Sequence, residues 1–402
     1  MNHEVCVTGL GVMAPHGGEP GTLFQALLDG QSAIQSIFPD LPKPAAAATV
    51  AFDETRWFTK LQLAGVDRVS QLAVAAADLA MRDAGLAMGD ADPERVGVYA
   101  GCGMGGAAAL EAAYRGNGRV SPLTIPAFMP NAPAAHVAMR HGVQGPVITY
   151  SVACASSSVA IAEAAKAIQR GEVDVAIAGG SEALIVPGVV LAWQAMQTLA
   201  TFQPGEAAGA VRPFASDRSG FALGEGAAFL VLESAERARS RDARSYATLA
   251  GWGLSSDATH LTKPDAPGQA RALRAALRQA GLQPRDVGYC NAHGTATRIG
   301  DVVERNALAD VWGDDLDQLR VSSTKALHGH LLGAAGAIEA LITVLALQRR
   351  QLPPNANCSE IDPACSLNLV TQNDTGAPAL DAAMSNSFAF GGTNSVLLFR
   401  RA

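Results

Sequence analysis

Cys154 is the residue whose setting in this sequence best suits covalent chemistry. It lies where the strand-like apolar run at 147–152 gives way to the small residues at 155–158 and then to a long alanine-rich helical pattern. A thiol at the N-terminus of a helix lies at the positive end of the helix dipole, which favours the reactive thiolate. We therefore expect a nucleophile at Cys154, against the alternative of a small buried structural cysteine.

Two histidines occupy similar places further along the chain. His293 follows the short apolar run at 287–290 and begins a polar, glycine-bearing loop, and His330 follows a strand-like run at 319–321 and precedes a helix rich in Gly and Ala. A single histidine in such a place is more often structural than catalytic. One cysteine and two histidines, each at the end of a strand, together indicate an acyl-transfer site.

The elements that must position these residues form a faint internal repeat. A helical pattern at 70–83 is followed by Ala-Gly-Leu and a strand at 95–99, and a second at 268–279 is followed by Ala-Gly-Leu and a strand at 285–289. A second pair aligns Cys154 and its helix with His330 and its helix. We predict two similar α/β halves with mostly parallel, buried strands, and an active site at strand ends where the halves meet.

The domain boundaries follow from this repeat. The N-terminal half, residues 1–240, carries the nucleophile and an irregular, proline-rich cap at 115–146, and the C-terminal half, residues 241–402, carries both histidines. The two halves are expected to pack as one unit.

Composition limits the classes of protein that fit. A chain of 402 residues, 49% hydrophobic and 17% charged, can bury a large core, and a net charge of −7 without a basic run argues against nonspecific nucleic-acid binding. The six cysteines show no paired metal-ligand spacing, so we expect reduced thiols and no metal. Neither a signal peptide nor an apolar run long enough to cross a bilayer is expected, which favours a cytoplasmic enzyme.

Several ordered blocks extend beyond the three site residues. They are VCVTGLG at 5–11, ACAS at 153–156, AGGSE at 178–182, the Arg- and Gly-bearing segment at 212–226, NAHGT at 291–295, Lys325 with Gly329 and His330, and NSFAFGGTN at 386–394. Through these blocks the whole chain resembles the β-ketoacyl-acyl-carrier-protein synthases, condensing enzymes of the thiolase superfamily. The resemblance implies a thiolase-like α/β fold in five layers, α-β-α-β-α.

The same resemblance implies a reaction. Cys154 would take an acyl group from the phosphopantetheine arm of an acyl carrier protein, and malonyl carrier would then lose its carboxylate to give an enolate that attacks the acyl-enzyme. His293 and His330 would donate hydrogen bonds to the enolate oxygen, and the backbone N–H groups of Cys154 and Phe390 would hold the tetrahedral oxyanion. No cofactor beyond the carrier's arm is implied.

Further residues match positions with supporting roles in the family. Lys325 would support the histidines, Glu339 would be a buried structural residue, and Phe390 would gate the site beside the flexible Gly391 and Gly392.

Other positions match substrate contacts. Thr295 and Thr297 would hydrogen-bond the pantetheine arm, although they also suit an ordinary threonine-rich turn. Met104 would line the acyl pocket, and Phe388 is assigned to substrate binding with it.

Three departures from the family pattern bear on the pathway. His328 replaces a small hydroxyl residue and either adds a donor or fills space, only Lys60 and Arg68 remain of a basic cluster that docks the carrier protein, and the block at 197–200 lacks an arginine. These differences favour a specialised polyketide or polyene synthase over housekeeping fatty-acid synthesis. The expected partners are acyl carrier protein and a second subunit, in a homodimer or in a heterodimer with a ketosynthase-like chain.

Two other functions share the fold. A noncatalytic chain-length subunit would lack the nucleophilic cysteine, and a degradative thiolase acting on coenzyme A would carry a second cysteine in place of the glycine-rich loop at 386–394. The residues present argue against both.

Overall fold

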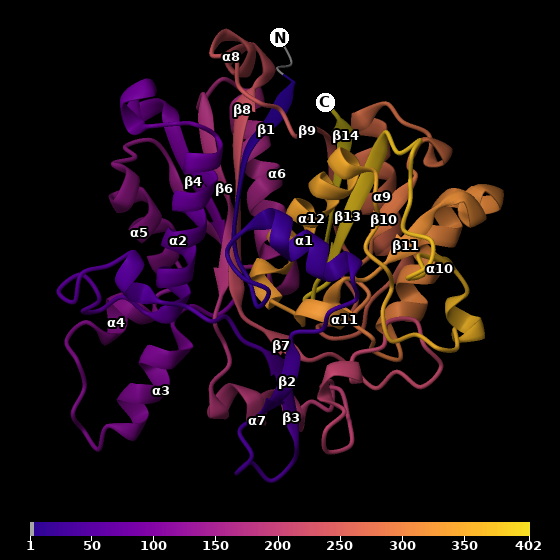
Figure 1. The fold of residues 1–402 in the computed structure, drawn as a ribbon, viewed down its shortest axis with the longest axis horizontal. Helices are drawn as coiled ribbons and strands as arrows, with labels where there is room; N and C mark the ends of the chain where they lie inside the picture. Colours follow the sequence, from indigo (N-terminus) through magenta and orange to yellow (C-terminus); the bar gives the residue numbers. More distant parts are fainter. Residues whose placement is uncertain (1–3) are drawn as a thin grey trace.

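The computed structural model describes residues 4–402, and the described strands form one long sheet and one small sheet (Figure 1). The long sheet has eleven strands in the order β12 (Asn368–Leu369), β11 (Arg320–Ser322), β10 (Tyr289–Asn291), β13 (Ala382–Phe388), β14 (Thr393–Arg401), β9 (Ala247–Ser256), β1 (Val5–Met13), β8 (Gly226–Ser234), β6 (Val175–Glu182), β4 (Val96–Gly101) and β5 (Val147–Tyr150).

The long sheet divides into two parts at the pairing of β1 with β9. Only two residue pairs join these strands, Cys6 with Thr248 and Val7 with Ala247. On one side lie the strands up to residue 234, and on the other the strands from residue 247 onward. The predicted boundary at 240/241 falls between these groups, at the end of α8 (Ala235–Ser240). Treating the two halves as separate domains stays a prediction.

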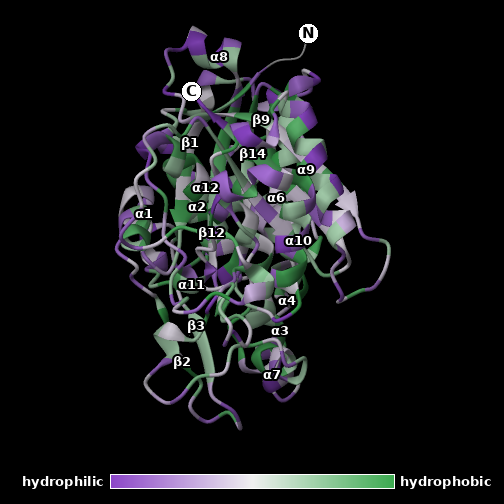
Figure 2. Ribbon diagram, turned by 90° about the vertical axis from the view of Figure 1, so that its right-hand side faces the viewer, coloured by the Kyte–Doolittle hydropathy of each residue, from purple (hydrophilic) through white to green (hydrophobic). Residues whose placement is uncertain are grey.

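Helices cover both faces of each half-sheet. One outer layer contains α2 (Arg68–Asp83) and α5 (Ala132–His141), the middle layer contains α6 (Ser156–Gln169) and α12 (Ala335–Arg349), and the other outer layer contains α9 (Ala266–Ala280) and α10 (Gly300–Trp312). Three buried apolar clusters fill the spaces between these layers. Hydrophobic residues concentrate in the central elements, whereas the peripheral α8 is largely hydrophilic (Figure 2). The predicted five-layer α/β arrangement is confirmed.

The first pair of repeated units has the same local chemistry in both halves. Asp67 and Asp265 cap α2 and α9 by accepting hydrogen bonds from backbone N–H groups of the first turn. Gly85 and Gly281, at φ 62° and 64°, let the chain leave each helix in the left-handed conformation. A short 3-10 turn then leads into β4 in one half and towards β10 in the other.

The second pair of repeated units is offset from the predicted alignment. Ala153 and Leu332, at φ 49° and 45°, begin equivalent 3-10 turns that lead into α6 and α12. Cys154 therefore corresponds to Gly333, and its predicted equivalence with His330 is wrong by three residues. The reason is that His330 lies in an extended segment beside β7 (Leu223–Gly224), to which its backbone is hydrogen-bonded.

The expectation of mostly parallel strands is also wrong. β8 runs antiparallel to both β1 and β6, and β14 runs antiparallel to both β13 and β9. Helices cover both faces of the sheet, so antiparallel strands here are as continuously apolar as parallel ones. The apolar runs therefore could not reveal strand direction.

The remaining elements build the ends of the molecule. They are α1 (Pro20–Leu28), β2 (Ile34–Ile37), β3 (Ala45–Ala48), α3 (Ala107–Arg115), α4 (Thr124–Phe128), α7 (Pro187–Ala195) and α11 (Lys325–His328), with β2, β3 and β7 forming the small sheet. The stretch at 115–146, expected to be irregular, contains α4 and α5. Its proline Pro133 stands in the first turn of α5, where a missing N–H costs nothing.

One segment has the length and composition of a membrane-spanning helix, contrary to the expectation that none would. Residues Leu332–Arg349 have a mean hydropathy of 1.4, but 89% of this segment is buried inside the protein. The helix is apolar on all sides because it is packed on all sides in the middle layer.

The N-terminal ends of α6 and α12 meet in the middle layer through small residues. A Cβ atom added at Gly336 would lie 2.8 Å from the backbone nitrogen of Ser158 and 2.7 Å from its Cβ. In the same contact, the Ser157 hydroxyl accepts a hydrogen bond of 2.9 Å from the backbone N–H of Ala337. Only glycine at 336 allows the helices to approach this closely.

We therefore predict that Gly336→Ala destabilises the protein, although alanine ordinarily stabilises a helix relative to glycine by about 1 kcal/mol. The steric conflict should lower the free energy of unfolding by roughly 1–3 kcal/mol, measured by denaturant unfolding. Gly209→Ala, where an added Cβ meets nothing within 4 Å, is the matched control. An unchanged or raised stability of the Gly336 variant would show that the helix contact can relax.

Candidate active site

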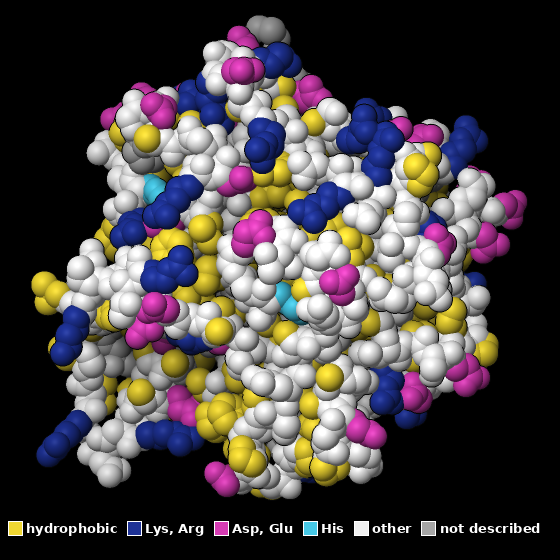
Figure 3. Space-filling view, viewed as in Figure 1, with side chains coloured by type: hydrophobic (Ala, Val, Ile, Leu, Met, Phe, Trp, Pro, Cys, Tyr) yellow, Lys and Arg dark blue, Asp and Glu magenta, His cyan; other side chains and the backbone are white. Residues whose placement is uncertain are grey.

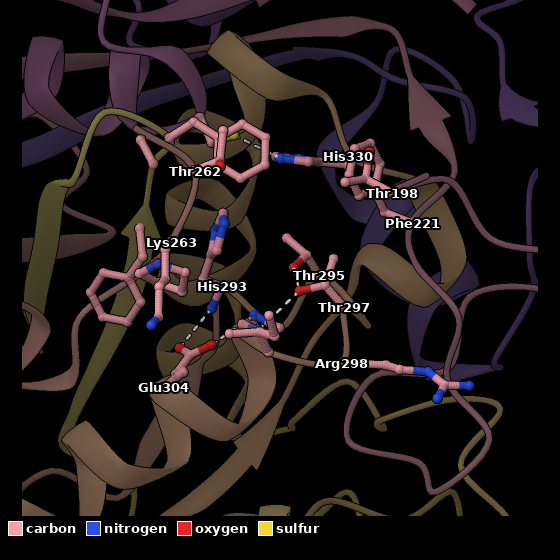
Figure 4. A pocket seen from close by; sticks show the side chains of 18 of the residues that line it. Thr198, Phe221, Thr262, Lys263, His293, Thr295, Thr297, Arg298, Glu304 and His330 are labelled. Carbon is pink, nitrogen blue, oxygen red and sulfur yellow. Dashed lines mark hydrogen bonds between the residues drawn. The ribbon is translucent and has the colours of Figure 1, made fainter. Parts of the chain in front are cut away.

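Cys154, His293 and His330 line one cavity of about 470 Å³ at the junction of the two halves (Figure 4). Cys154 comes from the turn before α6, His293 from the loop after β10, and His330 from the segment beside β7. Their side-chain donor atoms all lie within 4.8 Å of one another. The structure thus brings together the three residues that the sequence placed at separate strand ends.

Cys154 and His330 are in direct contact. The Sγ atom of Cys154 lies 3.1 Å from Nε2 of His330, and Nδ1 of the same ring accepts a hydrogen bond of 3.3 Å from the backbone N–H of Leu332. Because Nδ1 accepts, the ring proton of neutral His330 belongs on Nε2. His330 therefore presents an N–H donor to the sulfur and to any oxyanion formed beside it.

His293 is positioned by a glutamate that the sequence reasoning missed. Glu304, on α10, is buried and accepts hydrogen bonds of 2.9 and 2.8 Å from the backbone N–H groups of His293 and Gly294. It accepts another of 3.1 Å from Asn386. The His293 ring stands nearly perpendicular to that of His330, with ring centroids 5.6 Å apart. The sequence signal that could have revealed Glu304 was an acidic residue on the helix directly after the loop that carries His293.

The ionisation of Cys154 differs from the sequence-based expectation. Burial raises the pKa of the thiol to about 12, and the positive charge of Lys325 and the backbone N–H groups of Phe390 and Cys154 only partly oppose it. The prediction that the helix N-terminus would favour a resting thiolate is therefore wrong, because loss of solvation outweighs the dipole. Burial, and next the charge of Lys325, hold the pKa of both His293 and His330 well below the usual value, so both rings are neutral.

Lys325 and Glu339 form an ion pair in which both side chains are fully buried. Burial raises the pKa of Glu339 to about 7, and the contact with Lys325 opposes this rise. Neither side chain lines the cavity, but the charge of Lys325 acts on Cys154 and on both histidines. Lys325 therefore influences the site through its electric field rather than by contact.

The glycine-rich loop after β13 closes one side of the cavity. Phe390 stacks on Trp193 with ring centroids 6.1 Å apart, and its backbone N–H lies close enough to the Cys154 sulfur to lower the pKa of that thiol. Gly391 and Gly392 adopt φ values of 89° and 75°, which side-chain-bearing residues rarely adopt. The loop thus aims a backbone donor at the nucleophile, as the predicted oxyanion site requires.

Three of the four predicted substrate contacts lie in the cavity. Thr295 and Thr297 line it, with their hydroxyl oxygens 3.1 Å apart, and the Phe388 ring lies 6.1 Å from that of His293. Met104 is not among the lining residues and is 47% exposed. Its predicted contact with an acyl chain stays a prediction.

His328 lies outside the cavity and fills space behind it. Its ring is fully buried, with Nδ1 2.7 Å from the Gly329 carbonyl and Nε2 2.9 Å from the Thr324 hydroxyl. Burial lowers the pKa of His328 to about 3, so the ring is neutral, donates to the carbonyl and accepts from the hydroxyl. It braces the turn that carries His330, which is consistent with the space-filling alternative.

A second missed glutamate ties the halves together near the nucleophile. Glu182, at the end of β6, accepts hydrogen bonds of 2.8 and 3.0 Å from the backbone N–H groups of Gly103 and Gly333. Its side chain is fully buried, and burial raises its pKa to about 7. Glu182 thereby links the loop after β4 to the turn that begins α12.

Cys154, His293 and His330 also have the donor types of a zinc site. The charge of Lys325 acts on all three groups and disfavours a divalent cation between them. Neutral donors around a protonated thiol fit transient stabilisation of negative charge better than permanent metal binding.

The raised thiol pKa predicts how Cys154 reacts with iodoacetamide. Because the thiol is protonated at neutral pH, its alkylation rate should rise about tenfold per pH unit from about pH 6 to 9, without a plateau. Replacing the ion pair together, as Lys325→Met with Glu339→Gln, should slow alkylation at every pH because it removes the nearby positive charge. Peptide mass spectrometry that separates Cys154 from the other cysteines gives the rates. A plateau near pH 7 would contradict the burial argument.

Two family descriptions cover most of the chain. "Beta-ketoacyl synthase, N-terminal domain" matches residues 2–238, and "Beta-ketoacyl synthase, C-terminal domain" matches residues 246–359.

Individual relatives agree along the full length. Nodulation protein E of Rhizobium meliloti (strain 1021) is 41% identical, and 3-oxoacyl-[acyl-carrier-protein] synthase 2 of Staphylococcus aureus (strain N315) is 38% identical; the matches cover all of this chain and 100% and 99% of the respective relatives. The solved structure of the ishigamide ketosynthase/chain length factor superimposes with a TM-score of 0.92 at 32% identity over the whole of both chains. Because the family descriptions match most of the chain and the relatives match it along its full length, the chain belongs to the beta-ketoacyl synthase family.

Proposed function

We propose that this protein is a ketosynthase that accepts an acyl group on Cys154 and condenses it with malonyl carrier protein, extending the chain by two carbons. The observation that carries the proposal is the contact of a buried thiol with the Nε2–H of His330 and the backbone N–H of Phe390. These are donors for negative charge at the point where a thioester carbonyl would be attacked.

The first half-reaction is acyl transfer. The thiol proton must leave as sulfur attacks the thioester carbonyl, and the free thiol of the carrier's arm is released. The backbone N–H groups of Phe390 and Cys154 stabilise the thiolate and then the tetrahedral oxyanion, while the charge of Lys325 lowers the cost of ionising the thiol.

The second half-reaction is decarboxylative condensation. Loss of the malonyl carboxylate leaves an enolate whose oxygen gains negative charge. The neutral rings of His293 and His330 each carry one N–H group that can donate a hydrogen bond to this oxygen. The enolate carbon attacks the acyl-enzyme carbonyl, the bond from that carbon to the Cys154 sulfur breaks, and the departing thiolate takes up a proton to restore the thiol. The substrates bring their own phosphopantetheine arm, and the residues of the site require no further cofactor.

Both alternative functions fit the site less well. A chain-length subunit needs no nucleophile, whereas this cavity holds Cys154 with its donors in place. A thiolase would need a second cysteine at the site, but Cys154 is the sole cysteine among the described residues that line the cavity, and the glycine-rich loop with Phe390 takes that place.

The pathway and the partners are further proposals. The relatives include a 3-oxoacyl-[acyl-carrier-protein] synthase and a ketosynthase/chain length factor, which supports acyl carrier protein as the substrate carrier and a second ketosynthase-like subunit as a partner. On the face shown in Figure 3, basic side chains are dispersed among acidic and uncharged ones. We place the enzyme in polyketide or polyene synthesis in the cytoplasm.

An apolar face offers the site for the second subunit. It comprises large hydrophobic side chains of α3, α4, α5 and the edge strand β5, which pairs with β4 alone. They are Tyr114, Ile125, Met139, Val147 and Ile148, exposed by 83, 64, 67, 40 and 40%. An edge strand that is paired on one side only and carries exposed apolar side chains is suited to pairing with another chain.

The function is tested by mass spectrometry and product analysis. Incubation with a panel of acyl carrier proteins should add the acyl group to Cys154, and subsequent malonyl carrier should yield a 3-oxoacyl product two carbons longer. Cys154→Ala should abolish acylation, and His293→Ala should preserve acylation but reduce condensation by about 10²–10³. Absence of acylation by every carrier, alone and with a chain-length subunit, would refute the proposal.

If the apolar face binds a second subunit, a substitution on it should change the molecular mass of the protein in solution. We expect a dimer for the wild-type chain by light scattering and a monomer for Ile148→Asp, because a carboxylate buried without a partner in the interface is unfavourable. Ile361→Asp, which is 39% exposed away from this face, is the control. A wild-type chain that is monomeric alone and dimeric only with a chain-length subunit would establish the heterodimer instead.

A further inference from the structure

The cavity that holds Cys154 carries two cations among its lining residues. Lys263 and Arg298 both line it, and both side chains are exposed. Among residues 4–402, neither side chain forms an ion pair or a hydrogen bond with another side chain or with the backbone. In the view of Figure 4 they lie on opposite sides of Thr295 and Thr297. These two positive charges are therefore free to meet a ligand.

The acidic side chains of the same cavity already accept hydrogen bonds from the protein. Asp257 accepts hydrogen bonds of 3.1 and 2.7 Å from the backbone N–H of Asp265 and from Asn394, and Glu304 holds the backbone of His293 and Gly294. Both carboxylates are buried, in contrast to the two exposed cations. The charge that the cavity offers to an entering ligand is thus positive and lies where solvent reaches it.

The backbone beneath each cation is held in place. The carbonyl oxygen of Arg298 accepts a hydrogen bond of 2.8 Å from the buried Arg218, which is itself paired with Asp362 at 2.6 Å. The loop of Lys263 is tied to the glycine-rich loop by a hydrogen bond of 2.7 Å from the N–H of Gly391 to the carbonyl of Leu261. Two flexible side chains on fixed backbone positions are suited to binding an anion.

On the proposed function, the ligand that enters is a thioester on a phosphopantetheine arm. Its sulfur must reach Cys154, so the phosphate at the opposite end of the arm must lie where the cavity opens. We propose that Lys263 and Arg298 form a binding subsite for this phosphate. This inference rests on the proposed function and adds to it how the arm is recognised.

Two other features explain why this chain would rely on such a subsite. Gln197, which lines the same cavity, stands in the block that lacks an arginine, so it brings no charge. Arg68, one of two basic residues left in the expected carrier-docking cluster, is bound to Glu225 at 2.6 Å. Recognition of the arm at Lys263 and Arg298 would compensate for weak recognition of the carrier's surface.

The test compares two small substrates that differ only in the phosphate, acyl-phosphopantetheine and acyl-pantetheine. Their second-order rate constants for acylation of Cys154 are measured by mass spectrometry on the full-length chain. The wild type should prefer the phosphorylated substrate roughly three- to tenfold, as two exposed charged contacts would give. Lys263→Gln with Arg298→Gln should bring this ratio to about one, mainly by lowering the rate with acyl-phosphopantetheine.

The matched control removes the same charge elsewhere. Arg239→Gln with Arg285→Gln changes two exposed arginines that do not line the cavity, and the preference should be retained. Acylation by acyl-pantetheine reports in each variant that the site is folded.

Two results would overturn the subsite while the proposed function stands. One is equal acylation of the wild type by both substrates, and the other is an unchanged preference in the Lys263 and Arg298 variant. A wild-type chain that no thioester acylates, whether small or carrier-bound, would instead overturn the proposed function and the subsite together.

Discussion

The contact between the N-terminal ends of α6 and α12 is the constraint on which the site depends. Each helix follows a short turn that begins with a residue in the left-handed conformation, Ala153 in one half and Leu332 in the other. Because Gly336 and Ser158 allow the two helices to touch, the chain entering one helix lies against the chain entering the other. The 3.1 Å contact between Cys154 and His330 follows from this helix packing rather than from any local sequence motif.

The three central groups of the site are buried in their uncharged states. A thiol with a pKa of about 12 and two neutral imidazoles carry no charge in the resting enzyme. Burial makes fixed N–H donors more effective, since no solvent competes for the charge that develops. The Lys325–Glu339 pair supplies a positive charge close by without exposing it, and Glu304 fixes the backbone of His293. The energetic cost of burying these groups is thus tied to how this site would stabilise negative charge.

The sequence allowed prediction of what is local or carried by family blocks. The helices α2 and α9 and the placement of Cys154, His293 and His330 at strand ends were predictable from local patterns, whereas the five layers followed only from the family resemblance. Strand direction was not predictable, because helices cover both faces of the sheet and antiparallel strands are then as apolar as parallel ones. Glu182 and Glu304 were missed because they act on backbone groups 10 residues or more away in sequence, and the thiol pKa was misjudged because burial cannot be read from position.

The entrance and the oxyanion donors are parts of one backbone network. The N–H of Asp257 donates to the carbonyl of Gly392 at 2.8 Å, and the N–H of Gly391 donates to the carbonyl of Leu261 at 2.7 Å, so the segment leading to Lys263 is joined at two points to the loop carrying Phe390. The Phe390 N–H points at the nucleophile only while this loop keeps its conformation. Contacts made where the cavity opens therefore bear on the geometry at the sulfur, because a displacement of one loop must be transmitted to the other.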